Sequence, residues 1–398
     1  MFKRTLLLVL GLVQIATATS LENILKLVET KNYILKAKET KIRSSKIDAD
    51  LSNTWSNPVF SIGVTDINLN DPISRDIEAM QTQYITYNQV IPTNGKLKLS
   101  NDIKRHDTKV NQLEYNNYKQ KLKSEVISYS YTLIFQQEKV KILNKYLKNL
   151  TQQKKLLNLL YENGKMDQSS LVNIDIKIYK LKLQKQKLDY QISKIKNDLE
   201  KIVYEKINTI ELPQSIHSLK SNVHNDMESH PMILMIKQRI QQQNQRIQLE
   251  NSKKISDVKF TLGYYQREIF DDYISFNISI PLGIQGREKL KIQQSKINKE
   301  SINESLKSLK QELKITIEDL EKKVKVMKQN YELIDNKMIP LNELLEQSHQ
   351  IHLSANTMES LSVYESINSK YDLMILSKNE KISYFDALSK LLYFKGQL

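Results

Sequence analysis

The chain has 398 residues, 40% of them hydrophobic, and a formal net charge of +15. It contains no cysteine, which excludes disulfide bonds, thiolate metal sites and a lipid-modified N-terminal cysteine. Its lysines and arginines are spread among Gln, Asn and Glu, not gathered with aromatic residues in one block, so they indicate a solvated helix surface and no nucleic-acid partner is expected.

Residues 1–20 have the features of a secretory signal peptide. Lys3 and Arg4 form a basic start, Leu6–Ile15 an apolar centre and Ala16–Ala18 a small-residue cleavage site. The apolar centre is short for a membrane-spanning helix. We therefore expect an exported chain, with a retained membrane anchor as the alternative.

An internal repeat organises the rest of the chain. Tyr84–Pro92 matches Tyr273–Pro281 at an offset of 189, and Phe60–Val64 matches Phe260–Tyr264 at an offset of 200. Self-similarity of this kind indicates two copies of one structural unit. The expected divisions are a first repeat over 21–206, a link over 207–230 and a second repeat over 231–398.

Each repeat contains two segments whose apolar and polar residues alternate, as in strands. Thr82, Tyr84 and Thr86 fall on one face, and the residues between them fall on the other. Nine or ten residues is about the length of a tilted strand that crosses an outer membrane. The strands are expected at about 59–67, 82–91, 258–266 and 272–280.

Four tyrosines lie near the ends of these expected strands. They are Tyr84, Tyr264, Tyr265 and Tyr273. Tyrosine gathers at the interface between a membrane and water. The sequence therefore predicts an interfacial aromatic girdle.

Long helices are expected after the strands, because glycine and proline are absent over long stretches. One is Lys96–Asn163, about 100 Å long at 1.5 Å per residue. After a turn at Gly164, a return helix has apolar residues in alternating steps of three and four, typical of a coiled-coil seam. The seam comprises Leu171, Ile174, Ile178, Leu181, Lys185, Leu188, Ile192, Ile195, Leu199 and Ile202, with Lys185 its one polar member.

Helices are expected in three further places. One is Leu21–Leu51, ahead of the first strand, and another runs from Arg287 past Pro340 to Leu353. The third is a second return helix over Thr357–Phe394.

Four strands in one chain cannot close a barrel, and an open sheet edge cannot lie in lipid. Either the strands form two small hairpins in water, or several chains share one barrel. Two chains would give eight strands and a filled interior, whereas three would give twelve strands and a lumen. The residues alone thus lead to an oligomeric channel with a long helical extension.

Several short motifs stand in a fixed order along the chain. They are Asn57-Pro58, Gln89–Leu97, Tyr161–Gly164 with Ser170-Leu171, His230-Pro231, Ser279–Leu282 and Pro340. In these motifs the chain resembles the TolC-type outer-membrane efflux protein family, and in particular its heavy-metal branch of CusC- and CzcC-like proteins. The matching turn residues are Pro92, Gly95, Gly164, Pro281 and Gly286.

The resemblance implies a mainly α fold with a β-barrel part. It implies a trimer whose twelve-stranded outer-membrane barrel continues as a periplasmic coiled-coil barrel. The implied role is the duct of a tripartite efflux system for heavy-metal cations, with no catalysis and no cofactor. The implied partners are two further copies, a periplasmic adaptor, an inner-membrane resistance-nodulation-division (RND) pump and outer-membrane lipid. A multidrug or type I secretion duct is the alternative within the fold, and a periplasmic coiled-coil scaffold is the alternative outside it.

Acidic residues near the two helical turns raise the question of a gate. Some members of the family close the periplasmic end with aspartates, whose positions correspond to Ser360 and Val363 here. An acidic ring at this mouth, a device that favours cations, is a hypothesis. The alternative is that acids at helix N-termini complement the helix dipole. The acidic candidates are Asp167, Asp175, Glu359 and Glu365.

The sequence offers one further candidate for binding chemistry. His349 and His352 are three residues apart on an expected helix, a spacing that can share a metal ion. No third ligand is evident, so a solvated or interfacial histidine pair is the competing interpretation. No nucleophile with an adjacent base and no phosphate-binding glycine loop is evident in the sequence, and we expect no enzyme.

Overall fold

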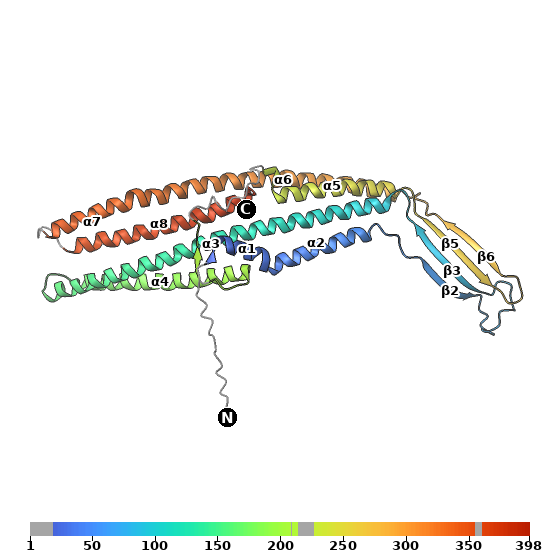
Figure 1. Ribbon diagram of the computed structural model, residues 1–398, viewed down its shortest axis with the longest axis horizontal. Helices are drawn as coiled ribbons and strands as arrows, with labels where there is room; N and C mark the ends of the chain where they lie inside the picture. The colour runs from blue at the N-terminus through green and yellow to red at the C-terminus, as the bar shows by residue number, and fades with distance from the viewer. Residues whose placement is uncertain (1–18, 208, 214–226, 355–359) are drawn as a thin grey trace, which may run out of the picture. The chain divides into compact units, whose positions relative to one another are not determined.

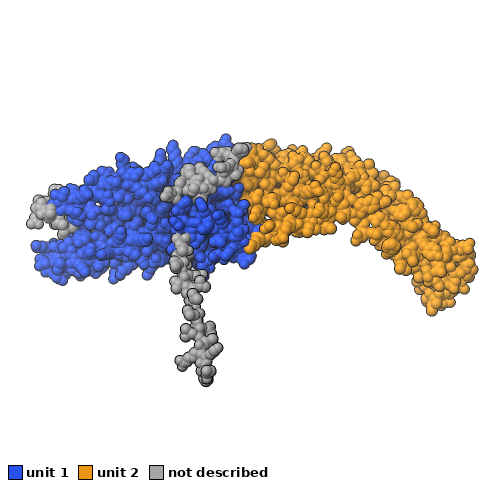
Figure 2. All heavy atoms as spheres, in the orientation of Figure 1, with its two compact units in different colours: residues 1–35, 118–227, 313–398 blue, residues 36–117, 228–312 orange. Residues whose placement is uncertain are grey.

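A computed structural model describes residues 19–207, 209–213, 227–354 and 360–398 (Figure 1). It consists of long helices and one four-stranded sheet, which confirms the expected mainly helical fold with a small β part. The chain forms two compact units (Figure 2). Unit 1 takes its described residues from 1–35, 118–227 and 313–398, and unit 2 from 36–117 and 228–312.

The sheet lies in unit 2 and has the strand order β2-β3-β5-β6. Every neighbouring pair is antiparallel. Pairing of β3 with β5 joins all four expected strands into one sheet, so they do not form the two separate hairpins that were one of the alternatives. The strands are β2 (Val59–Thr65), β3 (Thr82–Ile91), β5 (Val258–Gln266) and β6 (Tyr273–Ser279).

The expected bounds of β3 and β5 are confirmed, whereas β2 and β6 are shorter than predicted. β2 ends before Asp66, whose φ of 55° is incompatible with an extended strand. β6 begins after Asp272, whose carboxylate accepts a hydrogen bond of 2.9 Å from the Arg267 backbone N–H within the loop. The end of β2 is therefore set by backbone conformation and the start of β6 by a side-chain contact within the loop.

Two helices and parts of two longer ones complete unit 2. They are most of α2 (Tyr33–Leu51), α5 (Pro231–Ser252) and the N-terminal parts of α3 (Lys96–Glu162) and α6 (Arg287–Leu333). Pro231 occupies the first helical position of α5, where its missing N–H costs nothing. His230 caps this helix by accepting a hydrogen bond of 3.3 Å from the Met232 backbone N–H.

Unit 1 is built around a row of four helical segments in the order α4, α3, α8, α7 (Figure 1). The order follows from contacts between neighbours: Lys154 with Asp175, Asn149 with Asn368, and Glu343 with Lys370. The elements added here are α4 (Gln168–Val203), α7 (Ile339–Ser354) and α8 (Ser360–Phe394). α8 begins at Ser360 in the described chain, and 357–359 of the expected helix lie outside it.

The predicted coiled-coil seam of α4 is confirmed by burial. Its buried residues are Ile174, Ile178, Leu181, Leu188, Leu199 and Ile202. The central part of the seam packs in one cluster with Leu143 and Leu150 of α3, each 0% exposed. Lys185, the polar interruption, stays at the surface and pairs with Asp189 at 3.1 Å. Gly164 (φ 67°) makes the left-handed turn that closes α3 before the chain reverses.

Two expected helices contain interruptions. The stretch predicted as Leu21–Leu51 divides into α1 (Leu21–Lys31) and α2 at Asn32. Asn32 is buried, donates a hydrogen bond of 2.8 Å to the Ile202 carbonyl and accepts one of 3.0 Å from the Leu35 N–H. The Asn32 side chain therefore caps the start of α2 and takes the place of continuous helical hydrogen bonds, so the helix is interrupted at this residue.

The second interruption is a π-helical turn, η3 (Ile334–Met338), between α6 and α7. It ends two residues before Pro340, the residue that the sequence placed inside a continuous helix. Because proline lacks an N–H, the helical ladder must rearrange before it, and a π turn is one way to do so. The helix from Arg287 past Pro340 is thus confirmed, with this local change.

The remaining described segments are short. β1 (Thr19–Ser20) pairs in parallel with β4 (Ile210–Glu211), and η2 (Met227–Ser229) leads into α5. Residues 1–18 of the expected signal peptide and 214–226 of the expected link lie outside the described residues. The division of the chain into two repeats stays a prediction.

Candidate functional site

The two faces of the sheet differ in chemistry. Cross-strand pairing places Ile62, Ile85, Tyr264 and Ile274 in one row of side chains on one face, which we call the apolar face. No strand residue on this face is charged, and its polar members, Gln83, Gln89 and Gln266, lie toward the strand ends. The exposed apolar members are Phe60, Ile62, Val64, Ile85, Ile91, Leu262, Tyr264, Ile274, Phe276 and Ile278.

The apolar face has no cover among the described residues. Ile62 is 80% exposed and Ile274 is 73% exposed. A contiguous apolar surface of this kind marks a contact with lipid or with another protein. β3 has 10 residues and β5 has 9, the length of strands that cross a bilayer at a tilt.

The opposite face, which we call the polar face, carries hydroxyl, amide and glycine positions. One of its rows consists of Ser61, Thr86, Gly263 and Ser275. Asn88 accepts a hydrogen bond of 2.7 Å from the Thr261 hydroxyl in the next row. The alternation of an apolar face with a polar face is the pattern of strands between lipid and an aqueous lumen.

Three of the four tyrosines predicted to form an interfacial girdle lie on the polar face. Tyr84, Tyr265 and Tyr273 share one cross-strand row there, and only Tyr264 lies on the apolar face. Three of the four tyrosines therefore do not share the apolar face, and the girdle at a membrane interface stays a prediction. Adjacent residues such as Tyr264 and Tyr265 point to opposite faces, and proximity to a strand end does not say which face a residue takes.

The sheet has two open edges, β2 and β6. Along an antiparallel sheet of four strands, the first and the last run in opposite directions. β6 of one copy can thus pair with β2 of another and continue the antiparallel order. Exposed edges are templates for pairing with another chain.

A network of polar contacts fixes the junction where β3 passes into α3. The Asp257 carboxylate accepts hydrogen bonds from the Thr93 backbone N–H at 3.0 Å and from Lys96 at 2.6 Å. Asn94, with φ of 55°, donates to the Ser252 carbonyl at 3.0 Å. Burial would raise the pKa of the Asp257 carboxyl, but the contacts from Lys96 and Thr93 together hold it below its usual value. The motif Gln89–Leu97 thus binds the end of β3 to the segment before β5.

The acidic candidates near the helical turns have different surroundings. Asp175 is paired with Lys154 at 2.6 Å, a partner that the sequence did not reveal. Asp167 is the N-cap residue of α4 without a side-chain capping bond, and Glu365 is exposed on α8. Glu359 lies outside the described residues. The acidic ring stays a prediction, and of the described candidates only Asp175 has its charge balanced by an ion pair.

The histidine candidates do not come together with other ligands in the described part of the chain. His349 Nδ1 lies 3.0 Å from the Ser362 carbonyl oxygen, and the His352 side chain lies outside the description. Among the described residues, no group of three or more His, Asp or Glu side chains has the arrangement of a metal site. The metal interpretation of this pair stays untested.

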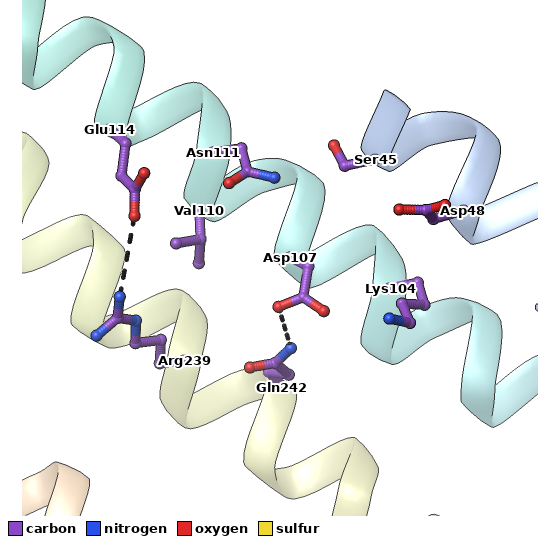
Figure 3. A pocket seen from close by; sticks show the side chains of 9 residues that line it. All are labelled: Ser45, Asp48, Lys104, Asp107, Val110, Asn111, Glu114, Arg239 and Gln242. Atoms are coloured by element: carbon purple, nitrogen blue, oxygen red, sulfur yellow. Dashed lines mark hydrogen bonds and ion pairs between the residues drawn. The ribbon is translucent and has the colours of Figure 1, made fainter. Parts of the chain in front are cut away.

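A polar pocket of about 320 Å³ lies in unit 2 (Figure 3). It lies between α2, α3 and α5, and its lining carries charges of both signs. Glu114 points toward Arg239 at 4.0 Å and is also 3.9 Å from Lys38, and Asp107 accepts a hydrogen bond from Gln242. Its lining residues are Ser45, Asp48, Lys104, Asp107, Val110, Asn111, Glu114, Arg239 and Gln242. These contacts hold the three helices together.

The outer helices of unit 1 carry apolar side chains that the described chain does not cover. On α4, opposite the buried seam, Val172, Ile176, Tyr179, Leu183 and Tyr190 are all exposed. On α7, Leu341 and Leu344 are 64% and 61% exposed. The exposed apolar residues on α4 follow the same three- and four-residue steps as the seam. This second apolar stripe was visible in the sequence, but only the seam was predicted.

Among the described residues, no helix is both long and apolar enough to cross a lipid bilayer.

No protein-family model and no curated protein matches the chain. Solved structures do match it by fold. One, described as showing CusC folding and transmembrane channel formation, has a TM-score of 0.77 at 11% identity over 95% of this chain and 92% of that chain. The CmeC outer membrane channel of Campylobacter jejuni has a TM-score of 0.75 at 13% identity over 94% and 85%. The outer membrane protein VceC of Vibrio cholerae has a TM-score of 0.73 at 13% identity over 95% and 96%.

These likenesses define the class of fold. The chain has the TolC-like fold of outer-membrane channel proteins, as the sequence motifs led us to expect. At such low identity the likeness concerns the fold, and it does not assign a cargo.

Proposed function

We propose that the protein is the outer-membrane duct of a tripartite efflux system and that it catalyses no reaction. The two-faced sheet with open antiparallel edges is the observation that carries this proposal. Its apolar face suits lipid, its polar face suits water, and its unpaired edges require further copies.

Three copies meet these requirements better than two. Eight strands enclose an interior that side chains fill, whereas twelve leave room for a lumen. The uncovered apolar residues on α4 and α7 support the same assembly, because these helices are the two ends of the row in unit 1. Pairing of α7 in one copy with α4 in the next is a head-to-tail contact, the type that closes rings.

The place of the duct in the cell follows from the same reasoning. We infer that residues 1–20 direct export, that the sheet lies in the outer membrane and that the helices extend into the periplasm. The partners are a periplasmic adaptor and an inner-membrane RND pump, which supplies the energy. Adaptor contacts at the helical turns near Gly164 and Ser360 would hold the duct in line with the pump.

For the cargo we propose heavy-metal cations. The support is the resemblance of the sequence motifs to the CusC- and CzcC-like branch. Multidrug efflux or type I secretion remains the second candidate, because the same fold serves different cargoes.

The first experiment measures the metal tolerance of a strain lacking this protein. The panel is zinc, cadmium, cobalt, nickel, copper and silver, with a detergent and a dye alongside. We expect sensitivity to one or two metals that the gene restores. Sensitivity to the detergent and dye with unchanged metal tolerance would overturn the metal assignment and leave the duct in place.

Two further measurements test the duct itself. The protein should remain in the outer-membrane fraction after a carbonate wash, whereas a periplasmic scaffold would be released. Tyr179→Asp, which places a charge in the exposed stripe of α4, should weaken the trimer in mild detergent. The matched control is Asn173→Asp, which adds the same single charge at an exposed position of the same helix outside the stripe. Equal oligomer stability in both variants would contradict the proposed contact.

A further inference from the structure

The polar face of the sheet is not uniform in the size of its side chains. Its rows consist mainly of serine, threonine, asparagine and glycine, with Val59, Val90 and Lys259 toward the end where the helices join. One row is different: Gly63, Tyr84, Tyr265 and Tyr273 stand side by side across all four strands. Only the pair Thr65 and Thr82 lies beyond this row toward the loops. The bulkiest layer of the polar face therefore lies close to its loop end.

The three tyrosine rings form a continuous aromatic row. The ring centroids of Tyr84 and Tyr265 are 5.7 Å apart, and those of Tyr265 and Tyr273 are 4.8 Å apart with nearly parallel planes. The Arg267 guanidinium lies 5.1 Å from the centroid of the Tyr273 ring and extends the row. Stacking and cation–π contacts of this kind restrict ring movement.

Two glycines allow the rings to lie against the sheet. A Cβ atom added at Gly63 would overlap the Tyr84 ring, and one added at Gly263 would lie 2.6 Å from a ring carbon of Tyr265. Neither glycine has a positive φ, so backbone conformation does not require glycine at these positions. Glycine is needed at both positions because the tyrosine ring occupies the space that a side chain would take. Packing of an aromatic ring over a strand glycine is known to stabilise sheets.

The location of the row gives it a meaning within the proposed channel. The helices join the sheet at the ends of the strands that lie away from the loops 66–81 and 267–272. If the helices extend into the periplasm, these loops lie at the outer mouth. Pairing of β6 with β2 of the next copy would continue the row around the lumen.

We propose that Tyr84, Tyr265 and Tyr273 form a girdle inside the channel, near its outer mouth, that limits its conductance and the size of the solutes that pass. This inference rests on the proposed duct function. The rings narrow the lumen more than the small residues of the neighbouring row Ser61, Thr86, Gly263 and Ser275. Gly63 and Gly263 keep the lumen open by letting the rings recline on the wall.

The test uses the full-length protein in planar lipid bilayers, with single-channel conductance as the readout. Replacement of the three tyrosines by alanine should raise the conductance roughly 1.5- to 2-fold, because pore width controls passage. It should also admit larger polyethylene glycols into the lumen. The matched control is Tyr87→Ala, on the same strand as Tyr84 but on the apolar face, which should leave conductance unchanged.

A second pair of variants has the opposite expected sign. Gly63→Ala and Gly263→Ala add one methyl group each, keep every tyrosine and displace the rings from the wall toward the lumen. Conductance should fall in both. These variants test the girdle even if the triple alanine variant does not assemble.

The outcomes separate the two proposals. A wild-type protein that forms no channel overturns the duct function. A wild-type channel whose conductance is the same in the tyrosine variants overturns the girdle and leaves the duct intact. Glycine variants whose conductance does not fall also contradict the girdle.

Discussion

Ile62→Lys is the most direct test of what the apolar face contacts. Ile62 lies at the middle of β2 and is 80% exposed in the described chain. Full burial of an isoleucine side chain contributes about 1.5–3 kcal/mol. Because only one fifth of the Ile62 surface is buried, its burial contributes roughly 0.3–0.6 kcal/mol. The substitution should cost no more than this if the apolar face lies in water.

In lipid the same substitution should cost far more. A lysine on the lipid face near the middle of a bilayer destabilises a barrel by about 2–4 kcal/mol. The two settings therefore differ several-fold in the predicted loss of unfolding free energy. The neighbouring residue Ser61 points to the polar face, so Ser61→Lys is a matched control with the same new charge. Its expected cost is below about 1 kcal/mol, because surface substitutions are usually mild.

The assay is a urea titration of wild type, Ile62→Lys and Ser61→Lys in phospholipid vesicles at one protein concentration. The concentration must be fixed because assembly makes the apparent stability depend on it. We expect a large loss for Ile62→Lys alone. Equal, small losses in the two variants would show that the apolar face does not contact lipid, and the reasoning from the two faces would be wrong.

Two further predictions concern unit 1. Leu143→Ala removes a fully buried side chain from the cluster between α3 and α4 and should lower the unfolding free energy by about 2–5 kcal/mol. Thermal denaturation in detergent measures this loss. Leu159→Ala, at an exposed position of the same helix, should have little effect. Burial would raise the pKa of Asp335 in η3, but Lys381 at 2.6 Å and Ser377 at 2.5 Å lower it below its usual value. Its stabilising contribution is therefore present above about pH 4 and lost as the pH falls through the lowered pKa. Asp335→Asn should cost about 1–2 kcal/mol at pH 7. Its melting temperature should approach that of wild type as the pH falls through the lowered pKa, whereas a difference that stays constant as the pH is lowered would contradict the role of the ion pair.

The sequence predicted what is local and periodic. The bounds of β3 and β5 and the buried seam through Ile174 and Leu188 follow from spacings within a few residues, and the structure confirms them. The glycine turn at Gly164 was likewise visible, because a left-handed turn is a property of one residue.

The sequence did not predict features that depend on partners far along the chain. Lys154 meets Asp175, and Asn32 breaks a helix through a contact with Ile202 that is 170 residues away. The joining of two hairpins into one sheet is also non-local, since β3 and β5 are separated by α3, α4 and α5. It was this register that placed Tyr265 on the polar face and Tyr264 on the apolar face.

The open edges of the sheet have a consequence for the kinetics of folding. The helical hairpin of α3 and α4 is stabilised mainly by contacts between neighbouring turns and its return partner, which form quickly. In the proposed trimer, the edge strands β2 and β6 gain their missing partners only when another copy arrives. The final step should then be a reaction between chains whose rate rises with their concentration, while an isolated chain waits with unpaired strands. During that interval the chain is open to wrong pairings, and a dilute chain is exposed to them for longest.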